Sequence, residues 1–304
     1  MSKHDDHDSR PEAVPAATAG AALDGELRLG VAADGDLRWA AADVAGPLEE
    51  ARYRLDLSPV SAVALGRALA AATLLLRFTT KASGRLLVEV LGDGPLGKIV
   101  AEADGQGHLR GRVEKPQLAT PDGGDMAIGW AVGKGLLRVT REGERGRYTG
   151  QVELVSGEMG RDLVHYLEQS QQIRSAALLG VLPRPTGIAA AGGVLIEAFP
   201  GTPDDTLAKL ESNIAALEGV SAYLADGGIA ALRDAVLDGF DRDDLERHRL
   251  AYSCRCSRDT LLAQLQGLST ADVETIVDDS GYCVAECAFC GTTYRFPSDE
   301  LATH

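Results

Sequence analysis

The five cysteines constrain this chain more than any other feature, because all of them lie after residue 250. Cys254 and Cys256 form a C-x-C pair, and Cys287 and Cys290 form a C-x-x-C pair after a gap of 30 residues. Two close pairs separated by a folded segment can supply four thiolates to a tetrahedral Zn²⁺. A domain as short as residues 254–304 can rarely be stable through its own hydrophobic core, so it needs a further stabilising element such as a bound metal ion. We therefore expect one zinc ion per chain, bound by these four cysteines.

The spacing leaves two roles open for the metal. A zinc ion that only holds a small domain together is the commoner role. A C-x-C pair can also close into a tight, strained disulfide that is easily reduced again, which is typical of regulatory disulfides. Zinc keeps each sulfur as a thiolate, the form that oxidants attack, and oxidation of one pair removes two ligands. The metal would then leave, and the small domain should unfold.

Other residues near the cysteines allow more than one interpretation. Arg249, Arg255 and Arg258 could stabilise the thiolates or could be solvated surface residues. Cys283 lies four residues before the C-x-x-C pair in an apolar-leaning stretch. We interpret it as a half-buried strand residue, and a fifth switching thiol is the alternative. Between the pairs, residues 257–268 and a segment capped by Ser269 predict two short helices, and the second pair predicts a turn into a strand.

The first 200 residues predict a mixed α/β domain. Asp34-Gly35 is a hairpin turn, and Ser58-Pro59 begins a long apolar helix that we expect to be buried in the core. Short alternating runs broken by glycine predict strands at 86–91, 98–103, 108–114, 136–142, 148–154, 176–182 and 192–199, and a further helix at 156–172.

After Pro203 the short alternating runs give way to a helical pattern, which predicts amphipathic helices as far as residue 250. Apolar residues recur at three- and four-residue spacing on both sides of a Gly227-Gly228 break. Such helices must pack on a neighbour and are only marginally stable alone. The predicted fold class is α+β, with a disordered acidic tail at 1–22, an α/β core domain at 23–200, a helical linker at 201–253 and a four-cysteine zinc domain at 254–304.

The charge and motif content of the chain exclude several functions. The net charge of -15 argues against nucleic acid and anionic lipid as partners. No apolar run of about eighteen residues is evident, and the nearest candidate, between Arg67 and Arg77, is too short to span a membrane. Without a secretion signal, we expect a cytoplasmic location. No catalytic constellation is present, and Ser156 is explained as a helix N-cap, so we expect no enzyme.

Several motifs resemble the redox-regulated heat-shock chaperones known as 33 kDa chaperonins. The cysteine segment from Cys254 to Phe296 is similar to the family pattern C-x-C-S followed by C-x-F-C-G-x-x-Y-x-F. LGDGPLGKIVAEAD, GQVELVSGEMGRDLVHYLEQSQQI and AAGGVLIEAFPG resemble segments of the family's core domain. The resemblance covers roughly residues 24 to 296. The acidic tail is an addition, and Cys283 stands where the family pattern leads us to expect an aliphatic residue.

The resemblance implies a chaperone that is inactive when reduced and zinc-bound. Oxidants would form Cys254–Cys256 and Cys287–Cys290 disulfides and expel the zinc. The linker would then unfold, and the protein would dimerise and hold unfolding client proteins without ATP, with possible transfer of clients to ATP-dependent foldases.

Two other functions compete with this one. A zinc-ribbon-like binding module with purely structural zinc would require a basic face beside the cysteines if its ligand were nucleic acid, and no such excess is present. A thiol oxidoreductase built on Cys287 and Cys290 lacks the strand-then-helix context that such a motif requires.

Overall fold

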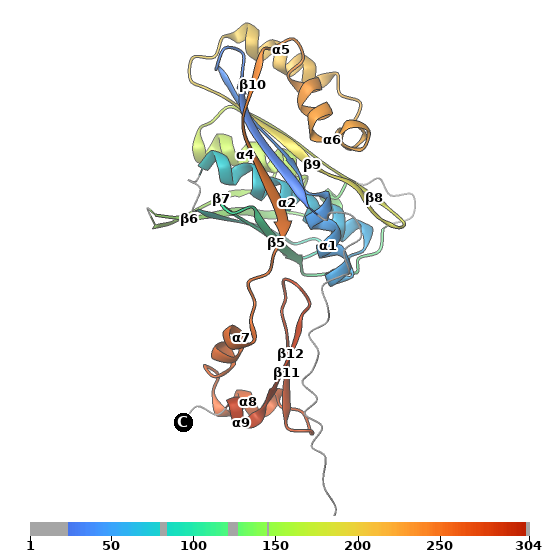
Figure 1. The fold of residues 1–304 in the computed structure, drawn as a ribbon, viewed down its shortest axis with the longest axis vertical. Coiled ribbons are helices and arrows are strands. Elements are labelled where there is room, and N and C mark those ends of the chain that lie inside the picture. The colour runs from blue at the N-terminus through green and yellow to red at the C-terminus, as the bar shows by residue number, and fades with distance from the viewer. Residues whose placement is uncertain (1–23, 80–83, 121–126, 145, 302–304) are drawn as a thin grey trace, which may run out of the picture. The chain divides into compact units, whose positions relative to one another are not determined.

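The computed structural model describes residues 24–79, 84–120, 127–144 and 146–301, so the predicted tail at 1–22 lies outside the described residues. The chain divides into a larger unit that ends at Cys254 and a smaller unit that begins at Arg255 (Figure 1). Both units mix helices and strands, which confirms the α+β fold class.

The larger unit is built on a ten-stranded sheet in the order β7-β6-β3-β4-β5-β10-β1-β2-β9-β8. All neighbouring strands in this sheet are antiparallel except β10 and β5, which pair in parallel over Ala251–His108 and Tyr252–Leu109. The strands are β1 (Gly25–Ala32), β2 (Leu37–Asp43), β3 (Arg85–Gly92), β4 (Ile99–Asp104), β5 (His108–Val113), β6 (Gly135–Gly143), β7 (Gly146–Glu153), β8 (Ser175–Arg184), β9 (Gly187–Ala198) and β10 (Arg242–Tyr252). The hairpin and the strands predicted up to residue 199 are thus confirmed.

One face of the sheet is covered by helix α2 (Pro59–Thr79), with α1 (Ala45–Leu55), α3 (Gly129–Val132) and α4 (Met159–Gln171) contributing to the same core. Ser58 caps α2, since its Oγ accepts a hydrogen bond from the Ser61 N–H at 3.4 Å. The predicted N-cap at Ser156 is wrong: α4 begins later, and the Ser156 Oγ accepts from the Glu158 N–H instead.

Helix α2 is also more apolar over its length than we predicted from the sequence. Within the described ranges, it is the one helix long and apolar enough to cross a membrane, and 89% of its most apolar window is buried inside the protein. The prediction counted Arg67 as an interruption, but a single arginine does not stop an apolar helix, and Arg67 forms an ion pair with Glu158. Its burial identifies α2 as the core helix that the sequence predicted.

The opposite face of the sheet is covered by α5 (Asp204–Ala215) and α6 (Val220–Val236). Strand β2 shows the alternation: Ala40 packs in the core with α2, whereas Trp39 and Ala41 pack with α6. The predicted break is confirmed, because Gly227 and Gly228 have non-helical backbone angles. The amphipathic helices therefore pack on the sheet, as their apolar spacing requires.

The last part of the segment predicted to be helical is a strand. Residues 242–252 form β10, which lies between β1 and β5 in the middle of the sheet. Its sequence, RDDLERHRLAY, is polar over most of its length and exposed at most positions, so it shows no apolar alternation. The long-range pairing with β1 sets its conformation, and a local pattern does not reveal such pairing.

The smaller unit contains α7 (Arg258–Leu265), α8 (Thr270–Ile276), β11 (Tyr282–Glu286), β12 (Thr293–Pro297) and α9 (Ser298–Leu301). Ser257 and Ser269 cap the two predicted helices, because their side chains accept hydrogen bonds from the N–H groups of Thr260 and Asp272. Its fully buried core consists of Cys283, Phe296 and Leu301. The prediction of a half-buried Cys283 is thus corrected: the side chain lies in β11 and is 2% exposed.

Candidate metal centre

The four predicted cysteines are placed by the ends of strands and the start of a helix. Cys254 follows the end of β10 by two residues, and Cys256 directly precedes Ser257, the N-cap of α7. Cys287 follows β11 directly, and Cys290 lies shortly before β12. Local signals that are visible in the sequence therefore place Cys256, Cys287 and Cys290, whereas Cys254 is placed by β10, which the sequence did not predict.

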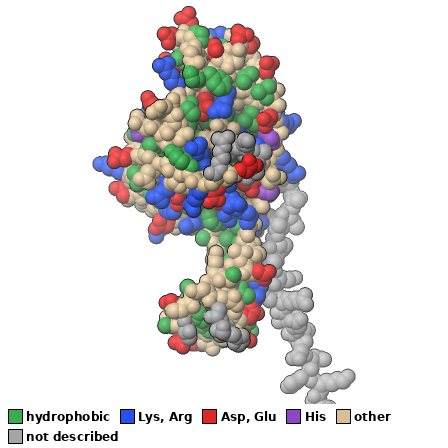
Figure 2. All heavy atoms as spheres, turned by 90° about the vertical axis from the view of Figure 1, so that its left-hand side faces the viewer, with side chains coloured by type: hydrophobic (Ala, Val, Ile, Leu, Met, Phe, Trp, Pro, Cys, Tyr) green, Lys and Arg blue, Asp and Glu red, His purple; other side chains and the backbone are tan. Residues whose placement is uncertain are grey.

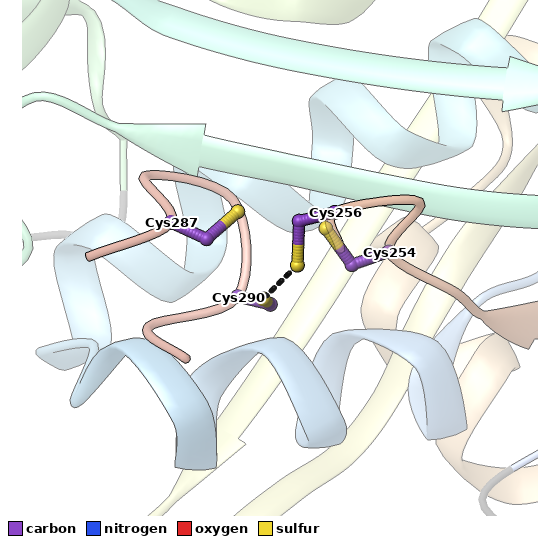
Figure 3. A group of neighbouring side chains, drawn as sticks. All are labelled: Cys254, Cys256, Cys287 and Cys290. Carbon is purple, nitrogen blue, oxygen red and sulfur yellow. Dashed lines mark hydrogen bonds between the residues drawn. The ribbon is translucent and has the colours of Figure 1, made fainter. Parts of the chain in front are cut away.

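The structure brings the four sulfur atoms together, all within 4.8 Å of one another (Figure 3). Cys256 Sγ and Cys290 Sγ are 3.4 Å apart. A tetrahedral zinc with Zn–S bonds of about 2.3 Å separates its sulfur ligands by roughly 3.8 Å, so only small adjustments are needed. Cys287 and Cys290 are buried, whereas Cys254 and Cys256 are partly exposed. This set of four soft ligands could hold a metal ion.

The C-x-x-C pair forms a tight hydrogen-bonded turn. The Cys287 carbonyl accepts from the N–H groups of Cys290 and Gly291, at 3.2 and 2.8 Å, and the Cys287 N–H donates to the Thr292 carbonyl at 2.9 Å. Gly291 has a φ of +69°, a conformation that residues with a side chain rarely adopt. The turn leads into β12, as the sequence predicted.

The surroundings of the cluster favour ionised sulfur. Burial opposes ionisation of Cys290, but hydrogen bonds from the hydroxyl and N–H groups of Thr292, and contacts with Cys256 and Cys287, lower its pKa overall. The Tyr294 hydroxyl lies 3.2 Å from Cys256 Sγ. This hydrogen bond, followed by burial and by the nearby thiolate charges, raises the pKa of Tyr294, so Tyr294 keeps its proton and donates a hydrogen bond to the sulfur. Thiolate is the form that binds metal and reacts with oxidants.

Two of the three arginines proposed to stabilise the thiolates have carboxylate partners. Arg249 pairs with Asp24, and Arg258 pairs with Glu300 at 2.7 Å. Sequence reasoning missed Arg110 of β5, whose guanidinium interacts with Cys254 and donates to Glu102 at 2.9 Å. The parallel register of β10 and β5 places Arg110 there, and the sequence offers no signal for that register.

Cys283 is not a member of the four-sulfur group. It lies opposite Phe296 in the β11–β12 ladder and forms part of the small core. Burial, and then the negative charge of Asp278, raise the pKa of its thiol. Both effects favour a neutral packing residue in the folded unit.

Comparison with known proteins identifies the family. The family model for the Hsp33 protein matches residues 26–297. The chain is 39% identical over 291 residues to the 33 kDa chaperonin of Thermus thermophilus, with 91% of this chain and 85% of that protein covered. It is 40% identical over 276 residues to the 33 kDa chaperonin of Symbiobacterium thermophilum, with coverage of 89% and 94%.

A solved structure supports the same assignment. The crystal structure of the 33 kDa chaperonin (heat shock protein 33 homolog) from Thermotoga maritima matches with a TM-score of 0.81 and 28% identity, over 91% of this chain and 96% of that one. The resemblance noted in the cysteine and core-domain motifs is thereby confirmed across both units. This chain belongs to the Hsp33 family of chaperones.

Proposed function

We propose that this chain is a redox-regulated, ATP-independent holdase whose switch is a zinc ion bound by Cys254, Cys256, Cys287 and Cys290. The observation that carries the proposal is the approach of four sulfurs to within 4.8 Å. Apart from Cys287 and Cys290 of this group, the hydrophobic core of the described part of the smaller unit has three buried members, Cys283, Phe296 and Leu301. A bound metal would then be the main stabilising element of the smaller unit. Loss of the metal would unfold that unit without chemical damage to the rest of the chain.

In the proposed switch, oxidation forms the Cys254–Cys256 and Cys287–Cys290 disulfides. For each disulfide, one peroxide molecule accepts two electrons from a pair of sulfurs. An S–S bond forms, the O–O bond breaks, and two protons from the thiols or from solvent complete two water molecules. A disulfide sulfur is a poor zinc ligand, so the four cysteines would no longer hold Zn²⁺ once oxidised. A thiol reductant reverses the reaction.

The proposed output of the switch is release of the linker helices α5 and α6. These helices cover an apolar face of the sheet that includes Leu37, Trp39, Val194 and Ile196. Once uncovered, this face and the apolar stripes of the helices would bind unfolding client proteins. The net charge of -15 would help to keep such complexes in solution. Dimerisation after oxidation, transfer of clients to foldases and a cytoplasmic location stay predictions.

The competing binding-module function receives little support from the charges. The segment 254–304 contains three arginines and no lysine against eight carboxylates. On the larger unit, acidic and basic side chains are interspersed over the face seen in Figure 2. Arg85, Arg110 and Arg138 each lie within 4 Å of a glutamate carboxylate. Such neutralised arginines make a poor phosphate-binding surface.

The test compares reduced, zinc-loaded protein with protein oxidised by peroxide under mild heat. We expect light scattering from a heat-unfolded client to be suppressed only by the oxidised form, together with release of one zinc per chain. Retention of zinc after complete thiol oxidation, or equal behaviour of the two forms, would contradict the proposal and favour structural zinc. Turnover of a disulfide substrate would instead support an oxidoreductase.

A further inference from the structure

Arg233 is a buried cation in the apolar stripe of α6. It is four residues after Ile229 and three before Val236, so it shares their face of the helix. Only 8% of the residue is exposed. A charged residue in such a position requires partners that compensate for its burial.

Those partners come from two strands and from α6 itself. The guanidinium lies 5.0 Å from the ring centroid of Trp39 in β2, a side chain with 0% exposure. Its Nη1 donates to both carboxylate oxygens of Asp244 in β10, at 2.9 and 3.2 Å. Its Nε donates to Asp234 at 2.8 Å. One side chain therefore joins α6 to two strands of the sheet by directional contacts.

The two aspartates that contact Arg233 belong to a larger network of charges of both signs. Asp234 also pairs with Arg242 at 3.2 Å, and Asp244 lies 4.0 Å from Arg28 of β1. Nη1 is directed at Asp244, whereas Nε and Nη2 are directed at Asp234, and these contacts fix an orientation that apolar packing alone does not define. Arg233 thus sets where and how α6 lies on the sheet.

We propose that Arg233 is the positioning residue that keeps the linker helix α6 packed on the sheet. This inference rests on the proposed function, because it concerns the helix whose release would activate the chaperone. Its partner Asp244 belongs to β10, which ends two residues before Cys254, so the strand that carries the linker contact leads to the first cysteine. The Arg233 contacts keep α6 packed on the sheet as long as the metal centre is intact.

The test uses the full-length, reduced, zinc-loaded chain with Arg233→Glu, which places a third carboxylate beside Asp234 and Asp244. We expect amide hydrogen exchange in 220–236 to be at least about tenfold faster than in the wild type, since contacts of a buried charge are lost. The zinc content should stay at one per chain. Arg233→Lys, which keeps the charge but loses the directional guanidinium contacts, should retain only part of the protection.

Arg184→Glu is the matched control. It makes the same charge change at an exposed position at the end of β8 and should leave exchange in 220–236 unchanged. If Arg233→Glu unfolds the entire larger unit, Arg233→Met keeps a long stem over Trp39 and removes only the charge. If residues 220–236 keep wild-type protection in Arg233→Glu, or in Arg233→Met where Arg233→Glu does not fold, the inference is overturned.

Failure of the inference and failure of the proposed function give different results. If α6 is released in Arg233→Glu and the reduced protein suppresses client aggregation, both are supported. If α6 is released but client aggregation is unaffected, the role of Arg233 stands and linker release is not the activating step.

Discussion

The two units of this chain reach stability by different means. In the larger unit, α2 alone contributes sixteen buried residues to a core that covers one face of a ten-stranded sheet. In the smaller unit, the buried core consists of Cys283, Phe296 and Leu301. A fully buried large apolar side chain contributes roughly 1.5–3 kcal/mol, so the larger core is sufficient and the smaller one is not.

This difference shows how one chain can combine a durable scaffold with a part that unfolds on a chemical signal. Hydrophobic burial in the larger unit does not respond to oxidants. The four sulfurs that we propose as zinc ligands respond directly, because oxidation removes their capacity to bind metal. The comparison predicts that the two units can be destabilised separately.

The largest effect is expected from removal of one of the four cysteines. Cys287→Ser should abolish tight zinc binding, and residues 255–301 should lose their amide protection, because structural zinc sites contribute on the order of 10 kcal/mol. The larger unit should keep its protection. Zinc content and hydrogen exchange measure the two effects. Cys283→Ala is the control: it also removes a thiol from the smaller unit but should leave zinc binding intact. A folded, protected smaller unit in Cys287→Ser would refute its dependence on the metal.

A smaller effect, in the larger unit, is expected from Leu69→Ala. Leu69 lies in α2 with 0% exposure, and truncation of such a residue costs about 2–5 kcal/mol. The urea midpoint of the larger unit should fall, while zinc content stays at one per chain. Tyr53→Ala, at a side chain 65% exposed in α1, should change the midpoint little. Loss of zinc together with the midpoint would show that the units are not independent.

The smallest effect concerns the pH dependence of the larger unit. Burial raises the pKa of Glu197, although Arg38 donates to it at 2.7 Å and opposes the shift. A carboxyl group whose pKa is raised on folding stabilises the fold fully below its unfolded value, and this stabilisation is lost as the pH rises through the folded value. Glu197→Gln should therefore flatten the fall in stability above pH 4.5. Urea titrations at several pH values measure this slope, and parallel profiles for the two proteins would contradict the prediction.

Local sequence signals predicted most elements and the candidate metal site. The β1–β2 hairpin follows from a two-residue turn between alternating runs, and Ser58, Ser257 and Ser269 mark helix starts through hydrogen bonds that span only three residues. The C-x-C and C-x-x-C pairs identified the four sulfurs that the structure brings together. Such signals are readable because the interacting groups lie close together in the sequence.

Contacts between distant segments were decided by the tertiary structure alone. Strand β10 carries no alternation of its own and forms because β1, more than 200 residues earlier, pairs with it. The parallel pairing of β10 with β5 places Arg110 beside Cys254, and the position of β10 in the sheet places Asp244 beside Arg233. The sequence determined which residues could bind a metal and which helices needed a surface to cover. Only the folded sheet determined which surface they cover and which arginines face the cysteine and the linker, because long-range strand register depends on the packing of the whole unit.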